Sequence, residues 1–215
     1  MSFFIKFIGN LHQKAVKPQQ SNCIVEYLAR YLPDEGRLLD VGCGTGKISH
    51  LVGQQKPQLR IQGIDILVQP NAEIQVQEFD GHTIPFEDNS FDAVTFVDVL
   101  HHTTNHQRLI SEAVRVSTGS IVIKDHLSNS WLDHKILSFM DWIGNRSLGI
   151  QSIYNYFSQA QWDSVFKEIG IEKVAKIQVK KLYPFPFGLI FNRNMQVLFV
   201  LHPSNTKTPV AKNQT

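Results

Sequence analysis

Hydrophobic and polar residues repeat along the chain with two different periods, and segments of the two kinds follow one another. Apolar residues on one face of residues 21–32 predict a helix that ends before Pro33. The runs at 37–41 and 91–100 are mainly apolar, as in parallel strands that are buried on both faces. By the same criteria, further helices are expected over 47–55, after Thr104, from Leu132 to Ile143 and from Ser158 to Ile169, and further strands over 59–66, from Ile74, and over 119–125, 173–181 and 195–201.

Local signals mark the ends of several of these elements. Thr104 with Gln107, and Ser158 with Gln161, have the spacing of capping boxes at helix starts. Gly170 stands where the last helix is expected to end, because glycine readily adopts the left-handed conformation that closes a helix.

Strands that alternate with helices predict an α/β fold with a Rossmann-like, mostly parallel seven-stranded sheet and helices on both faces. A single domain over 1–203 is expected, with a helical insertion at 131–157 between the fifth and sixth strands and a flexible tail at 204–215. Pro70 leaves room for a loop rather than a crossover helix between the second and third strands. In such sheets, ligands bind at the carboxyl ends of the strands.

Composition narrows the class of protein. A net charge of +2 over 215 residues, without a dense basic stripe, argues against nucleic-acid binding. Two cysteines, Cys23 and Cys43, make no disulfide framework and suit a reducing cytoplasm. The apolar segment 3–8 is too short for a signal-peptide core or for stable insertion into a membrane. It is expected to pack on the domain or to form a flap over the substrate or at a membrane surface.

A glycine-rich loop follows the first predicted strand. Gly42, Gly44 and Gly46 form G-x-G-x-G and allow a sharp turn with close approach of a ligand to the backbone. Lys47 stands where a dinucleotide-binding loop needs its third glycine, which disfavours a nicotinamide-dependent oxidoreductase. Ile48 excludes the phosphate loop of nucleotide triphosphatases, which needs serine or threonine there.

The wording Leu-Leu-Asp-Val-Gly-Cys-Gly-Thr-Gly over 38–46 resembles the glycine loop of class I S-adenosylmethionine-dependent methyltransferases. The resemblance implies S-adenosylmethionine as the cofactor. Its amino-acid end is then expected at the loop residues Asp40, Gly42, Cys43, Gly44 and Gly46. Asp65 and Ile66 lie at the end of the second strand, where a carboxylate can accept hydrogen bonds from both ribose hydroxyls.

Two further segments extend this resemblance. By analogy with the family, Asp80 contacts the adenine amino group with help from the backbone of Gly81, and Asp98 flanks the methionine portion of the cofactor. The wording Ile-Pro-Phe-Glu-Asp-Asn-Ser-Phe-Asp over 84–92 is typical of the branch that includes the ubiquinone and menaquinone methyltransferases. The resemblance covers residues 37–125 well and the ends of the chain only loosely.

Histidines end two of the strands at the expected site. His101, His102 and His126 are candidates for a general base if the acceptor must lose a proton, because an unperturbed imidazole has a pKa near 6.5. They are alternatively residues that position the acceptor or cap the strand ends. His102 and His106 have helical spacing, but no metal site is expected because no third ligand accompanies them.

The acceptor is expected between the fifth strand and the insertion. Lys124 either binds the acceptor or anchors the loop by ion pairing, and Arg146, Tyr154 and Tyr156 are candidates for lining the pocket. The sequence thus predicts methyl transfer to an oxygen, nitrogen or carbon centre of a small molecule. The alternative is a regulator or pseudoenzyme that binds S-adenosylmethionine or S-adenosylhomocysteine without turnover.

Overall fold

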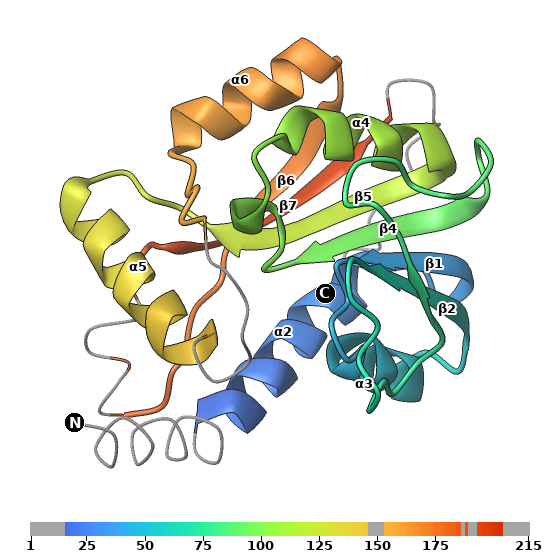
Figure 1. Ribbon diagram of the computed structural model, residues 1–215, viewed down its shortest axis with the longest axis horizontal. Coiled ribbons are helices and arrows are strands. Elements are labelled where there is room, and N and C mark those ends of the chain that lie inside the picture. The colour runs from blue at the N-terminus through green and yellow to red at the C-terminus, as the bar shows by residue number, and fades with distance from the viewer. Residues whose placement is uncertain (1–15, 146–152, 186–187, 189–192, 204–215) are drawn as a thin grey trace, which may run out of the picture.

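A seven-stranded sheet forms the centre of the computed structural model, which describes residues 16–145, 153–185, 188 and 193–203 (Figure 1). Its strands stand in the order β3-β2-β1-β4-β5-β7-β6, and β7 is antiparallel to both of its neighbours. The other pairs are parallel, so the predicted mostly parallel sheet is confirmed. The strands are β1 (Glu35–Val41), β2 (Gln58–Asp65), β3 (Val76–Glu78), β4 (Phe91–Val97), β5 (Ser117–His126), β6 (Glu172–Gln178) and β7 (Gln196–His202).

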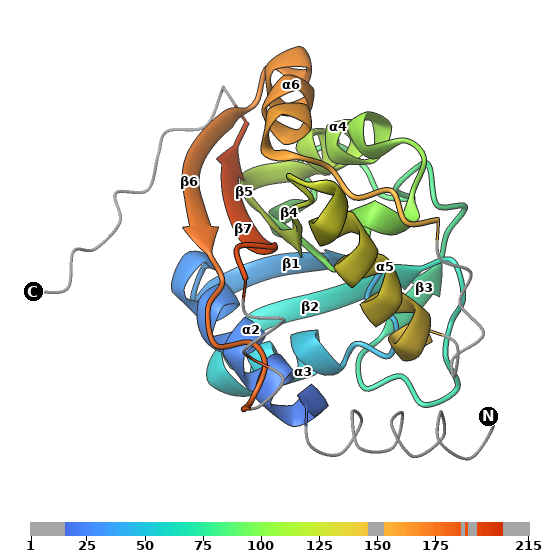
Figure 2. The ribbon, with the colours of Figure 1, turned by 90° about the vertical axis from the view of Figure 1, so that its left-hand side faces the viewer.

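Helices cover both faces of this sheet, as the alternating pattern predicts (Figures 1 and 2). On one face lie α4 (His106–Val116) and α6 (Gln159–Ile169), and on the other lie α2 (Lys17–Tyr31) and α3 (Lys47–Gln55). Adjacent strand residues enter opposite cores. Leu39 packs in the core that contains Ile110 and Trp162, whereas Leu38 packs with Leu28 and Val52. The central strands are apolar at consecutive positions because each face contacts a helix layer.

Two of the expected helix starts differ from the observed ones. The first described helix, α2, begins at Lys17 rather than at residue 21, with a proline in its first turn. The cap of α4 is Asn105 rather than Thr104, because the Asn105 side chain accepts a hydrogen bond from the Arg108 N–H at 2.9 Å. The capping box of Ser158 in α6 and the left-handed end at Gly170, with φ 73°, are confirmed.

The chain leaves β4 earlier than its apolar pattern predicts. The strand ends at Val97 because Asp98 adopts φ +56°, and a short 3₁₀ helix, η2 (Leu100–His102), follows. Between β2 and β3 the chain forms turns and no helix, as Pro70 indicates. No helix among the described residues has the length and apolar content that crossing a membrane requires.

The helix α5 (Trp131–Asn145) lies between β5 and β6 in the chain, which confirms a helical insertion at this point. It lies beside the carboxyl ends of the central strands (Figures 1 and 2). Leu137 packs with Tyr156 and Met195, while Trp131 and Phe139 are more than half exposed. One face of α5 is therefore fixed to the site edge and the other carries exposed aromatic rings.

The contact between β4 and β5 leads to a first prediction. A Cβ at Gly119 would lie 2.2 Å from the backbone oxygen of Asp92, so Gly119→Ala is expected to lower the free energy of unfolding by about 1–3 kcal/mol. Gly53→Ala, in α3, is the control: its Cβ would meet only the end of Ile61 at 3.3 Å, and alanine favours helix by up to about 1 kcal/mol. Urea unfolding of both variants tests this, and equal effects would contradict it.

Candidate active site

The glycine loop between β1 and α3 has two crowded positions and one open position. All three of its glycines have positive φ, between 57° and 72°. A Cβ at Gly42 would lie 2.5 Å from Val99, and a Cβ at Gly46 would lie 2.3 Å from Ile74. At Gly44 a Cβ would meet no atom within 4 Å. The loop therefore packs tightly on the protein through two glycines and leaves an open cradle at the third, which fits the close approach of a ligand.

Asp65 lies directly at this cradle. One of its carboxylate oxygens accepts the Gly44 N–H at 2.8 Å, and the other accepts the Leu67 N–H at 3.1 Å. The side chain is half-buried, and each oxygen can still accept a further hydrogen bond. The structure thus brings together two predicted cofactor residues that are 21 positions apart in the chain.

Asp40 supports the loop from below. It is buried, and its carboxylate accepts hydrogen bonds from the hydroxyls of Ser49 at 2.7 Å and Thr95 at 3.1 Å. Burial raises the pKa of Asp40 to about 6, although these two hydrogen bonds act in the opposite direction. The thiol of Cys43 packs towards Gly63, and burial raises its pKa as well. Through its hydrogen bonds to Ser49 and Thr95, Asp40 links β1 to α3 and β4.

The predicted adenine-contacting residues lie together beyond β3. One oxygen of the exposed Asp80 accepts the N–H groups of His82 and Thr83, each at 2.7 Å, and these bonds lower the pKa of the Asp80 carboxyl. Gly81 has φ +78°, and a Cβ there would lie 3.1 Å from Ile66. The side chain of Ile66 is 65% exposed. An apolar side chain and an ionised carboxylate thus flank the same short loop.

Asp98 ends β4 in a strained conformation that its neighbours maintain. A non-glycine residue at φ +56° is unfavourable, and the Asp98 N–H donates to the Lys124 carbonyl at 2.8 Å. The buried Lys124 ammonium contacts Asp98 at 2.5 Å and Gln196 at 2.7 Å. Burial lowers the pKa of Lys17, against the influence of Asp98, so the start of α2 also lies within electrostatic reach of this carboxylate.

A cluster of buried titratable groups lies behind Asp98. The Nδ1 atoms of His101 and His126 are 3.4 Å apart, and both face the same oxygen of Asp125, at 2.6 Å and 3.3 Å. The same oxygen accepts the His126 N–H, and the other oxygen accepts the Leu100 N–H at 2.9 Å. Asp125 has no exposed surface, and these donors hold its pKa well below the usual range despite its burial.

His101 also contacts a carboxylate on its other side. Its Nε2 lies 3.4 Å from Asp141 on α5, and the Tyr156 hydroxyl donates to the same Asp141 oxygen at 2.5 Å. Burial alone lowers the pKa of His101, but the two carboxylates outweigh burial and raise it to about 10. His101 is therefore an imidazolium at neutral pH, which is not the state that a general base requires.

The neighbouring histidines have the opposite character. Burial and the charge on His101 lower the pKa of His102 to about 4, and its Nδ1 is buried without a partner among the described residues. His106 stacks on Phe157 with ring centroids 3.8 Å apart, and burial lowers its pKa to about 4. His106 thus belongs to the core between α4 and α6.

The buried cluster contains atoms of the kinds that bind metal ions, close to one another. Ligand atoms of His101, Asp125 and His126 lie within 4.8 Å of one another. The His101 imidazolium and the Lys124 ammonium already provide positive charge beside the carboxylates. Ligand atoms of His101, His102 and Asp141 form a second group of this kind, so His102 has ligand-type neighbours that its spacing from His106 did not indicate.

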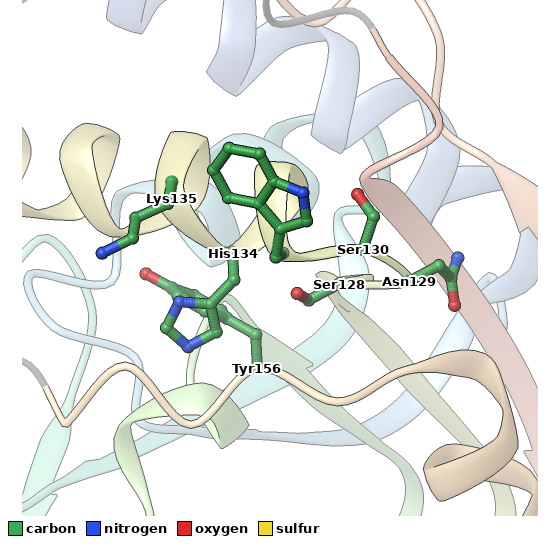
Figure 3. A pocket seen from close by; sticks show the side chains of 7 residues that line it. Ser128, Asn129, Ser130, His134, Lys135 and Tyr156 are labelled. Carbon is green, nitrogen blue, oxygen red and sulfur yellow. The ribbon is translucent and has the colours of Figure 1, made fainter.

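A cavity of about 440 Å³ opens beside Tyr156 at the start of α5 (Figure 3). Tyr156 and His134 meet edge to face, with ring centroids 5.5 Å apart. The walls of the cavity combine aromatic rings, hydroxyl and amide groups and one lysine. They come from Ser128, Asn129, Ser130, Trp131, His134, Lys135 and Tyr156. Tyr156 joins this cavity to the buried cluster because its ring also stacks on His101, at 5.4 Å.

The remaining predicted substrate residues have mixed positions. Tyr154 is half-buried with φ +57° and packs against the Leu137 and Met195 cluster. Arg146 lies outside the described residues, as do the apolar segment 3–8 and the tail 204–215.

Sequence reasoning missed Asp141. Its sequence signal is an acidic residue four positions after the apolar Leu137, one turn along the same face of the helix.

Comparisons with known proteins show which family the chain resembles and which solved structures share its fold. The family model described as a methyltransferase domain matches residues 19–176. Demethylmenaquinone methyltransferase of Thermotoga maritima is 29% identical over 184 residues, covering 78% of this chain and 78% of that protein. A chain in the complex that contains the Haloferax volcanii Trm112 methyltransferase activator has a TM-score of 0.69 at 16% identity, covering 93% of this chain and 96% of that chain. Geranyl diphosphate C-methyltransferase from Streptomyces coelicolor, solved with Mg²⁺, geranyl diphosphate and S-adenosyl-L-homocysteine, has a TM-score of 0.63 at 13% identity, covering 85% and 79%.

The two carboxylates around His101 predict a pH dependence of stability. The pKa of an unfolded histidine is about 6.5, and that of His101 in the fold is about 10, so the folded state binds more protons between these values. The stabilisation is complete below about pH 6.5 and is lost as the pH rises towards 10, by at most about 1.4 kcal/mol per pH unit.

Urea unfolding from pH 6 to 10 tests this expectation. We expect a shallower decline with pH in His101→Gln than in the parent, and an unchanged decline in His134→Gln, whose histidine is exposed on α5. Parallel curves for the parent and His101→Gln would show that His101 is not charged in the folded protein.

Proposed function

Because this chain belongs to the S-adenosylmethionine-dependent methyltransferase family, we propose that it methylates a small molecule whose acceptor atom loses a proton. The family match covers residues 19–176, which include the glycine loop, Asp65, Asp98 and the histidines. S-adenosylmethionine supplies a methyl group that is activated on a sulfonium centre. The residues of the chain then have to bind the cofactor, orient the acceptor and take up its proton.

The cofactor-binding proposal rests on the open cradle at Gly44. We assign the amino-acid end of the cofactor to the glycine loop and to Asp98, and the ribose hydroxyls to Asp65. The loop beyond β3, with Asp80, Gly81 and the exposed Ile66, is assigned to the adenine ring. Asp40 and Cys43 shape the loop from the protein side in this proposal.

The single observation that carries the proton-transfer proposal is the setting of His126. Its Nδ1 lies 3.3 Å from Asp125 and 3.6 Å from Asp98, so carboxylates face this nitrogen from two strand ends. If Nδ1 carries the hydrogen and donates it to Asp125, Nε2 is left with a free lone pair that can accept a proton. We therefore assign His126 as the general base, with His101 as a charged positioning residue and His102 as a neutral wall of the site.

The acceptor is placed beside α5. Tyr156 connects the cavity in Figure 3 to the histidine cluster, and Trp131 adds an aromatic wall to it. Most of the catalytic effect of such a site comes from holding acceptor and methyl group in line, which contributes up to roughly 7–11 kcal/mol. A positioned base adds about 10²–10⁴-fold. The mild net charge of +2 favours a small molecule over a nucleic acid.

Calorimetric titration with S-adenosylhomocysteine tests the ribose assignment. Asp65→Ala is expected to weaken binding by about 1.5–3 kcal/mol, the range for hydrogen bonds to a charged group. Asp163→Ala, which removes a partly exposed carboxylate on α6, is the control and should bind like the parent. Equal affinity of the Asp65→Ala variant and the parent would show that the ribose lies elsewhere.

Turnover tests the base. With labelled S-adenosylmethionine and a panel of phenols, amines and carbon acids, we expect His126→Gln to lower the turnover of the accepted compound by about 10²–10⁴-fold. Binding of S-adenosylhomocysteine should change less than about twofold, because His126 lies on the acceptor side. His202→Gln, a similarly buried histidine at the far end of β7, is the control. A parent protein that binds cofactor but methylates none of the panel would favour the regulator alternative.

A further inference from the structure

Two adjacent histidines share one carboxylate oxygen at the base of the site. The Nδ1 atoms of His101 and His126 both face Asp125 Oδ1 and lie only 3.4 Å from each other. Two imidazolium ions at this separation repel one another, so the second proton is harder to add than the first. The chemistry of the site therefore depends on which histidine receives the first proton.

The surroundings of the two rings are unequal. His101 has a second carboxylate, Asp141, 3.4 Å from its Nε2. His126 has Asp98 as its second contact, 3.6 Å from Nδ1, and the Lys124 ammonium already contacts that carboxylate at 2.5 Å. The Asp141 charge also acts on His126, but of these two rings Asp141 contacts only that of His101 in the described part of the chain. No lysine or arginine among the described residues forms an ion pair with Asp141, and its direct contact with a histidine is to His101, so its negative charge favours a proton on His101 over one on His126.

Tyr156 holds Asp141 in place. Its hydroxyl donates to the Asp141 oxygen that faces His101, at 2.5 Å, and its ring stacks on His101 at 5.4 Å. The other titratable groups near the two rings are His102, whose ring is tilted against that of His101 with centroids 4.0 Å apart, and His134, which meets Tyr156 edge to face. Neither of these two histidines carries a negative charge that would favour a proton on His126.

We propose that Asp141, oriented by Tyr156, directs the first proton taken up by the two histidines to His101. His126 then stays neutral and free to act as the base. Asp141 and Tyr156 are positioning residues that act through His101 and touch no reacting atom. This inference rests on the assignment of His126 as the base, but the location of the proton can be measured without turnover.

The arrangement also links the base to the insertion. Asp141 and Tyr156 come from α5 and from the segment after it, which form the wall of the acceptor cavity, whereas both histidines lie at strand ends. His126 is therefore ready to accept a proton only when α5 is seated against the strand ends. Removing the Asp141 charge should move the proton to His126 and leave the base occupied at neutral pH.

Histidine side-chain NMR with ¹⁵N labelling tests the proposal directly. In the parent at pH 7.5 we expect an imidazolium at His101 and a neutral ring at His126 with an unprotonated Nε2. In Asp141→Asn, which keeps the shape and an acceptor for Tyr156, the proton should move to His126. Tyr156→Phe should change the populations in the same direction but less, and it keeps the ring. Asp133→Asn, eight residues and so just over two turns of α5 from Asp141, is the control.

The pH profile of kcat/KM provides the second measurement. Its acid limb should move up by about one pH unit in Asp141→Asn, a tenfold change, and should stay in place in Asp133→Asn. An imidazolium that remains on His101 in both Asp141→Asn and Tyr156→Phe would overturn the proposal. If the proton moves as expected but His126→Gln keeps full turnover, the proton placement stands and the assignment of the base fails.

Discussion

Asp125 carries a negative charge at a position that water does not reach. An unpaired buried carboxylate is highly unfavourable, by several kcal/mol even after relaxation, so the surrounding chain has to supply donors and positive charge. It does so from two neighbouring strand ends: the Leu100 N–H and the His101 ring follow β4, and the His126 N–H and ring end β5. The directions of both chain segments at the site edge follow from this requirement.

The same constraint extends to the insertion. Neutralising Asp125 places an imidazolium at His101, and this buried cation in turn pairs with Asp141. α5 is consequently fixed by a polar contact and by the small apolar cluster around Leu137, while its aromatic outer face stays exposed. The left-handed Asp98 fits the same scheme, because the buried Lys124 holds both its backbone and its carboxylate. Strain at that residue is offset by an ion pair.

One side of the candidate site is formed mainly by backbone groups and the other mainly by side chains. The proposed cofactor side consists largely of backbone: glycines that tolerate positive φ, an open cradle at Gly44 and Asp65 bound to that backbone. The proposed acceptor side consists of side chains from β5, η2, α5 and the segment around Tyr156. A backbone site can be common to many methyltransferases, since its chemistry does not vary with the acceptor. A side-chain site can differ from protein to protein, which is where selectivity for the acceptor arises.

Local patterns in the sequence were sufficient to predict the helix layers, the mostly parallel sheet, the loop at Gly42 to Gly46 and the cap of α6. Each of these features depends on neighbours within a few residues. Where two local choices competed, as between Thr104 and Asn105 at the start of α4, the reach of one side chain decided. The end of β4 and the charge of His101 depend instead on partners 24 to 26 residues away or more. A histidine in isolation indicates a base; only the tertiary structure, by placing two carboxylates against His101, raises the pKa of that imidazole to about 10, and the role of base is therefore proposed for His126.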